Sequence, residues 1–136
     1  MAGLGDSFML PKPGQDTEHL WVLITRPHPQ THAAIMVNVT TQRPHSDTTT
    51  ILNAGEHPFV QKPSVIFYAD ARMVDARLLD QSVASGAFRA HAAFQQAVLK
   101  KIQDGVMKSP FTPRKIKDAY TAAIAAGLVW AKSPAP

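Results

Sequence analysis

The chain has 136 residues, of which 45% are hydrophobic, and a single domain of this size buries roughly 65 to 70% of its unfolded surface. The absence of cysteine excludes a disulfide framework, a thiol nucleophile and a cysteine–zinc site, and it fits a cytoplasmic protein. The net charge of +4 permits a polyanionic partner. We expect no signal peptide, because residues 1–10 lack a basic segment and a long apolar core, and no membrane-spanning segment, because no run of about eighteen apolar residues occurs.

Short strands separated by turns are expected over the first part of the chain. A strand at 7–10 and a turn at 11–14 precede a continuous apolar run at 19–25, which is typical of a central strand buried on both faces. Two prolines make residues 26–31 a loop. Further strands are predicted at 33–39, at 50–52 before a turn at 53–57, and from Ser64 onward. This pattern indicates a small antiparallel barrel or sandwich.

Helical periodicity replaces the strand pattern after about residue 85. Apolar side chains such as Phe88 and Leu99 recur at close to helical spacing and predict a helix over 85–105, ending near Gly105. A second helix is expected from Thr112 as N-cap, with Pro113 in its first turn, to residue 128. The sequence therefore predicts one α+β domain over 1–136, with a barrel at 5–80 and a helical extension at 85–129.

The chain lacks the motifs of several enzyme classes. It has no glycine-rich phosphate loop and no Gly-x-Ser-x-Gly turn, and its carboxylates are too scattered for a glycosidase. His45, Asp47 and His57 could share a metal ion, but no tight ligand spacing supports that site. We therefore predict neither a metal nor another cofactor, and metal-dependent hydrolysis around these three residues stays a third option.

Hydroxyl and imidazole groups recur near the predicted strand ends, at His19, Thr40, Thr41, His57 and Ser64. Metal-independent RNA cleavage requires one group that removes the 2′-hydroxyl proton, one that protonates the leaving oxygen, and donors that hold the phosphate charge. Imidazoles, whose pKa is ordinarily about 6.5, suit the first two tasks. Threonine hydroxyls, Arg43 or Arg72 suit the third.

Several segments occur in an order that resembles the MazF/PemK toxins. They are Gly5-Asp6, the apolar run at 20–25, Val39-Thr40-Thr41, and the strand from Ser64 that continues through Arg72 and Asp75 to Arg77-Leu78. The resemblance covers residues 5–79 and implies an SH3-like barrel, an endoribonuclease toxin, a homodimer, and a protein antitoxin that occludes the site. It also implies that Thr40 or Thr41 is catalytic and that a short helix ends at Arg77-Leu78.

The chain departs from that family just before the second strand. Active members carry an arginine followed by proline there, whereas this chain has Glu18-His19, and its Arg26-Pro27 lies at the far end of the strand. We expect His19 to replace the arginine, which shifts the chemistry from a fixed cation toward an acid–base imidazole. The predicted catalytic residues are thus His19, Thr40, Thr41 and His57, and the predicted RNA contacts are Arg43, Arg72, Lys100 and Lys101.

Each of these residues also has a structural explanation. Threonines suit strand ends, His57 can brace its turn, and Arg72 and Asp75 can pair with each other or cap the next helix. Lysines of the helical segment can form its solvated face. The alternative function is therefore a non-catalytic SH3-like module that binds nucleic acid or protein.

Overall fold

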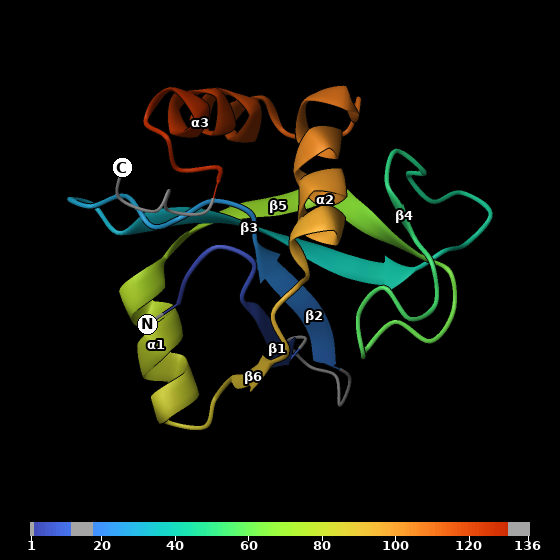
Figure 1. Ribbon diagram of the computed structural model, residues 1–136, viewed down its shortest axis with the longest axis horizontal. Coiled ribbons are helices and arrows are strands. Elements are labelled where there is room, and N and C mark those ends of the chain that lie inside the picture. Colours follow the sequence, from blue (N-terminus) through green and yellow to red (C-terminus); the bar gives the residue numbers. More distant parts are fainter. Residues whose placement is uncertain (1, 12–17, 131–136) are drawn as a thin grey trace.

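The computed structural model describes residues 2–11 and 18–130. Within these ranges the chain is an α+β fold, in which antiparallel strands form a curled half-barrel in the order β4-β5-β3-β2-β1-β6 (Figure 1). The elements are β1 (Ser7–Pro11), β2 (Glu18–Leu23), β3 (Ala33–Thr41), β4 (Ile51–Leu52), β5 (Ser64–Asp75), α1 (Ala76–Ala84), β6 (Arg89–His91), α2 (Gln96–Lys108) and α3 (Arg114–Ala125). The predicted α+β class and antiparallel sheet are confirmed, and the turn expected at 11–14 lies almost wholly outside the described residues. No helix in the described part of the chain has the length and hydropathy to cross a membrane.

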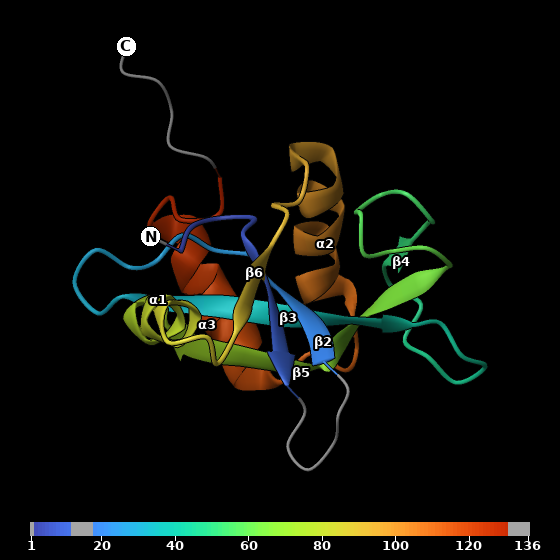
Figure 2. The same cartoon turned by 90° about the horizontal axis from the view of Figure 1, so that it is seen from below.

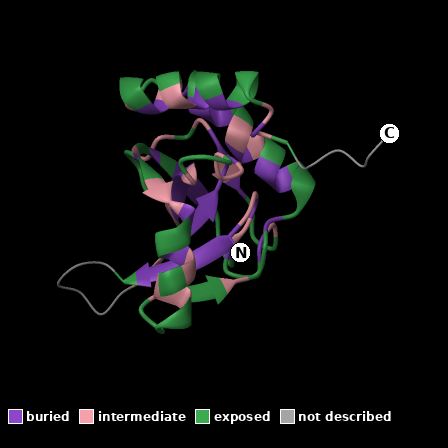
Figure 3. Cartoon of the chain, turned by 90° about the vertical axis from the view of Figure 1, so that its left-hand side faces the viewer, coloured by how far each residue is buried: buried purple, intermediate pink, exposed green. Residues whose placement is uncertain are grey.

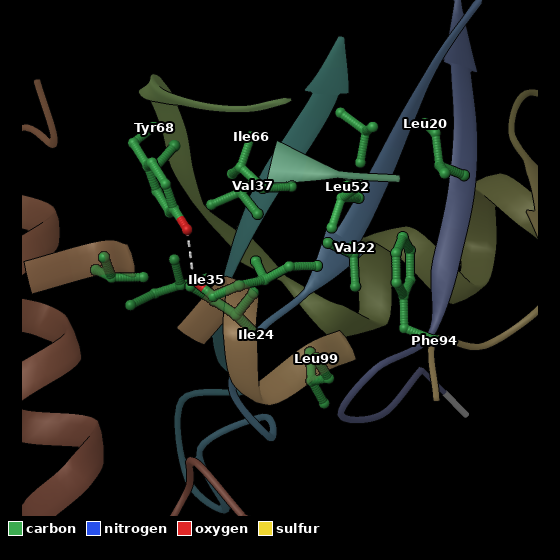
Figure 4. Close-up of a cluster of buried hydrophobic side chains, with 14 of the residues drawn as sticks. Leu20, Val22, Ile24, Ile35, Val37, Leu52, Ile66, Tyr68, Phe94 and Leu99 are labelled. Atoms are coloured by element: carbon green, nitrogen blue, oxygen red, sulfur yellow. Dashed lines mark hydrogen bonds between the residues drawn. The ribbon is translucent and has the colours of Figure 1, made fainter. Parts of the chain in front are cut away.

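β2 is the buried central strand that its apolar run predicts. Leu20 and Val22 belong to a cluster that also contains side chains of α2 and α3, whereas Trp21 and Leu23 belong to a second cluster that includes side chains of α1. Successive strand residues point to opposite faces, so a strand covered on both faces is apolar at every position. The buried positions therefore concentrate on the strands (Figure 3), and the larger cluster fills the space between the sheet and α2 (Figure 4).

The pairing of β3 with β5 contains an irregularity that bends β5. Met36 pairs with Arg72 and Asn38 with Phe67, so residues 68–71 of β5 lie opposite Val37 alone. Extra residues on one strand of a pair increase local bending and twist, which curls the sheet. The irregularity divides β5 into one part that pairs with the start of β3 and another that pairs with its end.

The helix predicted over 85–105 is wrong in its first half. Residues 89–91 form β6, which pairs with β1, and α2 begins only at Gln96 (Figure 2). Gly86, with φ +83°, turns the chain after α1, and the open edge of β1 then pairs with β6. Helical spacing of apolar residues is a weak preference, and the hydrogen bonds that an unpaired sheet edge offers override it here. The sheet therefore includes a strand from the segment that was expected to be wholly helical.

The short helix implied after Asp75 is present as α1. The Asp75 carboxylate accepts a hydrogen bond from the Arg77 backbone N–H, which makes it the N-cap. Arg77 and Leu78 lie at the beginning of this helix rather than at its end. The second predicted helix is confirmed as α3, although its N-cap position is Pro113 and not Thr112.

Candidate functional site

A hollow of about 1080 Å³ opens where β2 begins and β3 ends, and we call it the rim hollow. From the strands it is lined by Glu18, His19, Thr40, Thr41 and Ser64. From the loops and β6 it is lined by Arg43, Phe59, Lys62 and His91. Its size lies just above the roughly 300 to 1,000 Å³ that is usual for small-molecule sites. The antiparallel pairing of β2 and β3 explains its place, because the start of one strand lies beside the end of the other.

Four of the predicted site residues line this hollow together: His19, Thr40, Thr41 and Arg43. The β2–β3 register pairs Leu20 with Val39, which sets His19 beside Thr40 on the adjoining strand. Because side chains alternate along a strand, His19 and Thr40 lie on one face of the sheet and Thr41 on the other. The rim hollow therefore has contributions from both faces, at the edge where the strands end.

His57 lies outside the rim hollow and is only 2% exposed. Its Nδ1 accepts a hydrogen bond from the Phe59 backbone N–H at 3.0 Å, so the proton is on Nε2, which donates to the Ala92 carbonyl oxygen at 2.6 Å. Its ring also stacks on Phe94, with 4.3 Å between the ring centroids. Burial lowers the pKa of His57 below its ordinary value. The structure thus gives His57 a supporting position, in which it fixes the loop that carries Phe59 to the segment that follows His91.

The predicted RNA contact at Arg72 also lies away from the rim hollow. Its guanidinium is 4.9 Å from the centre of the Trp21 ring and forms an ion pair with Asp70 at 3.0 Å. Of the two structural explanations for Arg72 and Asp75, the helix cap is confirmed for Asp75, which caps α1, whereas the mutual pair is not formed, because Asp75 pairs with Arg77. Arg72 therefore lies over the Trp21 ring and does not line the rim hollow.

Lys100 and Lys101 lie on α2 and do not reach the rim hollow either. Lys100 is paired with Asp104 one helical turn further on, and Lys101 is paired with Glu56 at 2.8 Å. Their positive charges are therefore balanced locally. The solvated helix face that was the alternative explanation describes Lys100, whereas Lys101 is less exposed and is held by Glu56.

His91, Phe59 and Lys62 line the rim hollow although the sequence did not single them out. His91 was missed because residues 85–105 were assigned to a helix, in which its side chain would not face the sheet. The Ser85-Gly86 dipeptide was the available signal, since such pairs mark turns. The Nδ1 atom of His91 accepts a hydrogen bond from the Ala92 backbone N–H at 2.7 Å, and its ring lies edge-on to Phe59.

The charges around the rim hollow favour an anion. The guanidinium of Arg89 donates two hydrogen bonds to the Glu18 carboxylate. These hydrogen bonds are the main reason why the pKa of Glu18 lies below its ordinary value. Glu18 is therefore an ionised carboxylate whose charge is balanced by its partner. Arg43 and Lys62 form no ion pair with any carboxylate of the described ranges.

The three residues of the metal option do not gather. Asp47 accepts hydrogen bonds from the Ser109 hydroxyl at 2.6 Å and from Thr49, and His57 is buried elsewhere. Among residues 2–11 and 18–130, no group of three or more histidine, aspartate or glutamate side chains is arranged to hold an ion. The structure therefore gives no support to hydrolysis by a metal held at these residues.

Comparison of the chain with family models, with curated proteins and with solved structures found no match in any of the three.

Proposed function

We propose that the rim hollow binds RNA and cleaves it without a metal ion. The observation that supports this proposal is the convergence of two imidazoles, His19 and His91, with two cations, Arg43 and Lys62, in one hollow. Imidazoles exchange protons near neutral pH, and fixed cations attract a phosphodiester. The threonine hydroxyls at the end of β3 add hydrogen-bond donors.

The chemistry follows from these groups. One imidazole removes the proton from a 2′-hydroxyl while that oxygen forms a bond to the adjacent phosphorus, and the other gives a proton to the departing 5′ oxygen as its bond to phosphorus breaks. Arg43 and Lys62 stabilise the negative charge that gathers on the phosphate oxygens. The products are a 2′,3′-cyclic phosphate and a 5′-hydroxyl, so an all-deoxy strand is not cut.

The resemblance to MazF/PemK toxins adds a cellular role to this proposal. It implies that the curled sheet is an SH3-like barrel, that the protein acts in the cytoplasm as a homodimer, and that an antitoxin protein covers the rim hollow. In this interpretation His19 occupies the place of the family's arginine, and His91 supplies the second proton-transfer group.

A non-catalytic binding module is the second candidate, and the alternation along β3 favours it. Thr40 and Thr41 point to opposite faces of the sheet, so the two hydroxyls cannot approach one phosphate from the same side. Because side chains from both faces of the sheet line the rim hollow, it suits contact with several nucleotides of an RNA strand. The same cations would then bind RNA without cutting it.

Cleavage of a fluorescent single-stranded RNA in the presence of EDTA tests the proposal. We expect cutting by the wild type and a loss of about 10²- to 10⁴-fold in rate for His19→Ala and for His91→Ala. His28→Ala is the matched control, because His28 lies in the loop at the opposite end of β2 and β3.

Induced expression gives the corresponding test in cells. Growth arrest by the wild type that His19→Ala abolishes, with an unchanged circular dichroism spectrum, supports the enzyme. Binding without cutting, together with equal growth of both strains, supports the non-catalytic module instead.

A further inference from the structure

A second hollow, of about 430 Å³, adjoins the rim hollow, and we call it the side hollow. Thr40, Thr41 and Arg43 line both, so the end of β3 and the start of the next loop form the wall between them. Beyond this wall the side hollow is lined by Val65 and Phe67 of β5 and by the loop at 44–47. Thr40 pairs with Val65, which places the two hollows side by side along the sheet edge.

Phe67 is the notable side chain of the side hollow. It is 44% exposed, whereas Ile66 and Tyr68 on either side of it are fully buried. Its ring therefore lies on the sheet face opposite the main core, with no element of the described chain covering it fully. An exposed aromatic ring beside an open hollow can stack on another flat ring.

Phe59 occupies the equivalent place in the rim hollow. Its side chain is 40% exposed, and its backbone N–H is held by His57. The wall that carries Arg43 thus has one open phenylalanine ring on each side. Cations that hold the backbone, together with aromatic rings that stack on successive bases, are features of proteins that bind single-stranded nucleic acid.

The carboxylate of Asp47, which lines the side hollow, is held by hydrogen bonds within the protein. Asp47 accepts hydrogen bonds from the Ser109 hydroxyl and from the backbone and side chain of Thr49. Its oxygens are therefore occupied by donors of the protein itself. Arg43 lines both hollows and forms no ion pair with a carboxylate of the described ranges, so its charge is available to an anion between them.

We propose that the side hollow is a second nucleobase subsite of the ribonuclease site. When a phosphate lies on Arg43 at the wall, the base on one side of it stacks on Phe59, and the base on the other side stacks on Phe67. The inference rests on the proposed function, because it takes RNA as the ligand of the rim hollow. Stacking on protein rings requires bases that are free of a complementary strand, so the nucleotides on both sides of this phosphate are unpaired.

Binding of a fluorescent 2′-O-methyl RNA, which lacks the attacking hydroxyl, measures the subsite apart from cleavage. We expect Phe67→Ala to weaken the affinity by about tenfold, as loss of one stacked base does, and Phe67→Trp to keep it. Phe111→Ala is the matched control, because Phe111 is 59% exposed, lies between α2 and α3, and lines neither hollow. Annealing the complementary strand should abolish binding.

Oligonucleotides with a single abasic site locate each base. We expect one abasic position at which Phe67→Ala causes no further loss, and a different position, across one phosphate, at which Phe59→Ala causes none. A Phe67→Ala variant that binds like the wild type, or one that loses the same affinity at every abasic position, overturns the subsite. Those outcomes leave cleavage intact, whereas a wild type that binds RNA with the Phe67 dependence and does not cut it overturns the enzyme alone.

Discussion

At the scale of single residues, Gly105 sets how closely α2 approaches the sheet. The buried Tyr68 hydroxyl donates to the Ile102 carbonyl oxygen at 2.6 Å and shares a hydrogen bond with the Thr50 hydroxyl at 2.7 Å. A Cβ atom on Gly105 would overlap with both hydroxyl groups. Glycine is therefore required here by space, although it lies inside a helix.

We expect Gly105→Ala to lower the free energy of unfolding by about 1–3 kcal/mol, the usual cost of overpacking a filled core. This loss opposes the gain of about 1 kcal/mol that alanine brings as the better helix former. Denaturant unfolding of the single variant and of the same change in a Tyr68→Phe background measures the effect. The cost should shrink when the tyrosine hydroxyl is absent, and an equal cost in both backgrounds would contradict the overlap.

His57 gives a prediction for pH. Its pKa is lowered in the folded protein, chiefly by burial, from an ordinary value of 6.5. Between the two values the unfolded chain binds more protons than the folded one, so the free energy of unfolding falls as pH drops below about 6.5. Unfolding midpoints of wild type and His57→Gln over pH 5 to 8 should show a shallower slope in the variant. Parallel slopes would show that His57 does not titrate with folding.

At the scale of elements, the strands were predicted more accurately than the helices because burial on both faces leaves an unambiguous pattern. β2 contains the apolar run 20–23 and β3 the apolar run 33–37, and the structure places both strands centrally in the sheet. The segment at 85–105 has an apolar spacing that suits a helix, and residues 89–91 form a strand only because they pair with β1. This pairing depends on residues about 80 positions earlier in the chain, so the local sequence pattern does not reveal it.

The contribution of the Asp75 N-cap to α1 can be measured by hydrogen exchange. Hydrogen bonds from the Arg77 side chain and backbone lower the pKa of Asp75 to about 2, so its contribution is complete above about pH 3.8 and is lost as pH falls toward 2. We expect Asp75→Ala to speed amide hydrogen exchange in the first turn of α1 at neutral pH. Asp118→Ala, which removes an exposed aspartate paired with Arg114 within α3, should leave α1 unchanged. Unaltered exchange in α1 of the first variant would argue against the cap.

At the scale of the whole molecule, the residues that gather in the rim hollow come from four separate segments. His19, Thr40 and Arg43 could be proposed from the sequence because they flank two recognisable strands. His91 could not, since it reaches the hollow only through β6. Lys100 and Lys101 were proposed from local charge alone, and the structure pairs each with a carboxylate.

The salt dependence of RNA binding separates a local contact from the net charge of +4. We expect the double variant Arg43→Ala, Lys62→Ala to reduce the slope of log affinity against log salt by about 1.4, because each phosphate contact on a single strand contributes about 0.7. The double variant Lys115→Ala, Lys117→Ala removes the same total charge from α3 and should keep the wild-type slope. Equal reductions in both variants would mean that overall charge, and not the rim hollow, attracts RNA.

Because β6 comes late in the chain, the sheet remains incomplete during much of its synthesis on the ribosome. While the ribosome has released only the first 80 or so residues, β1 has no neighbour along its outer edge, and His91 has not yet joined the rim hollow. An exposed strand edge invites pairing with other chains. A truncated product that stops after α1 should therefore self-associate and lack the proposed RNA cleavage, whereas extension through Phe94 adds the edge strand β6 and brings His91 into the lining of the rim hollow.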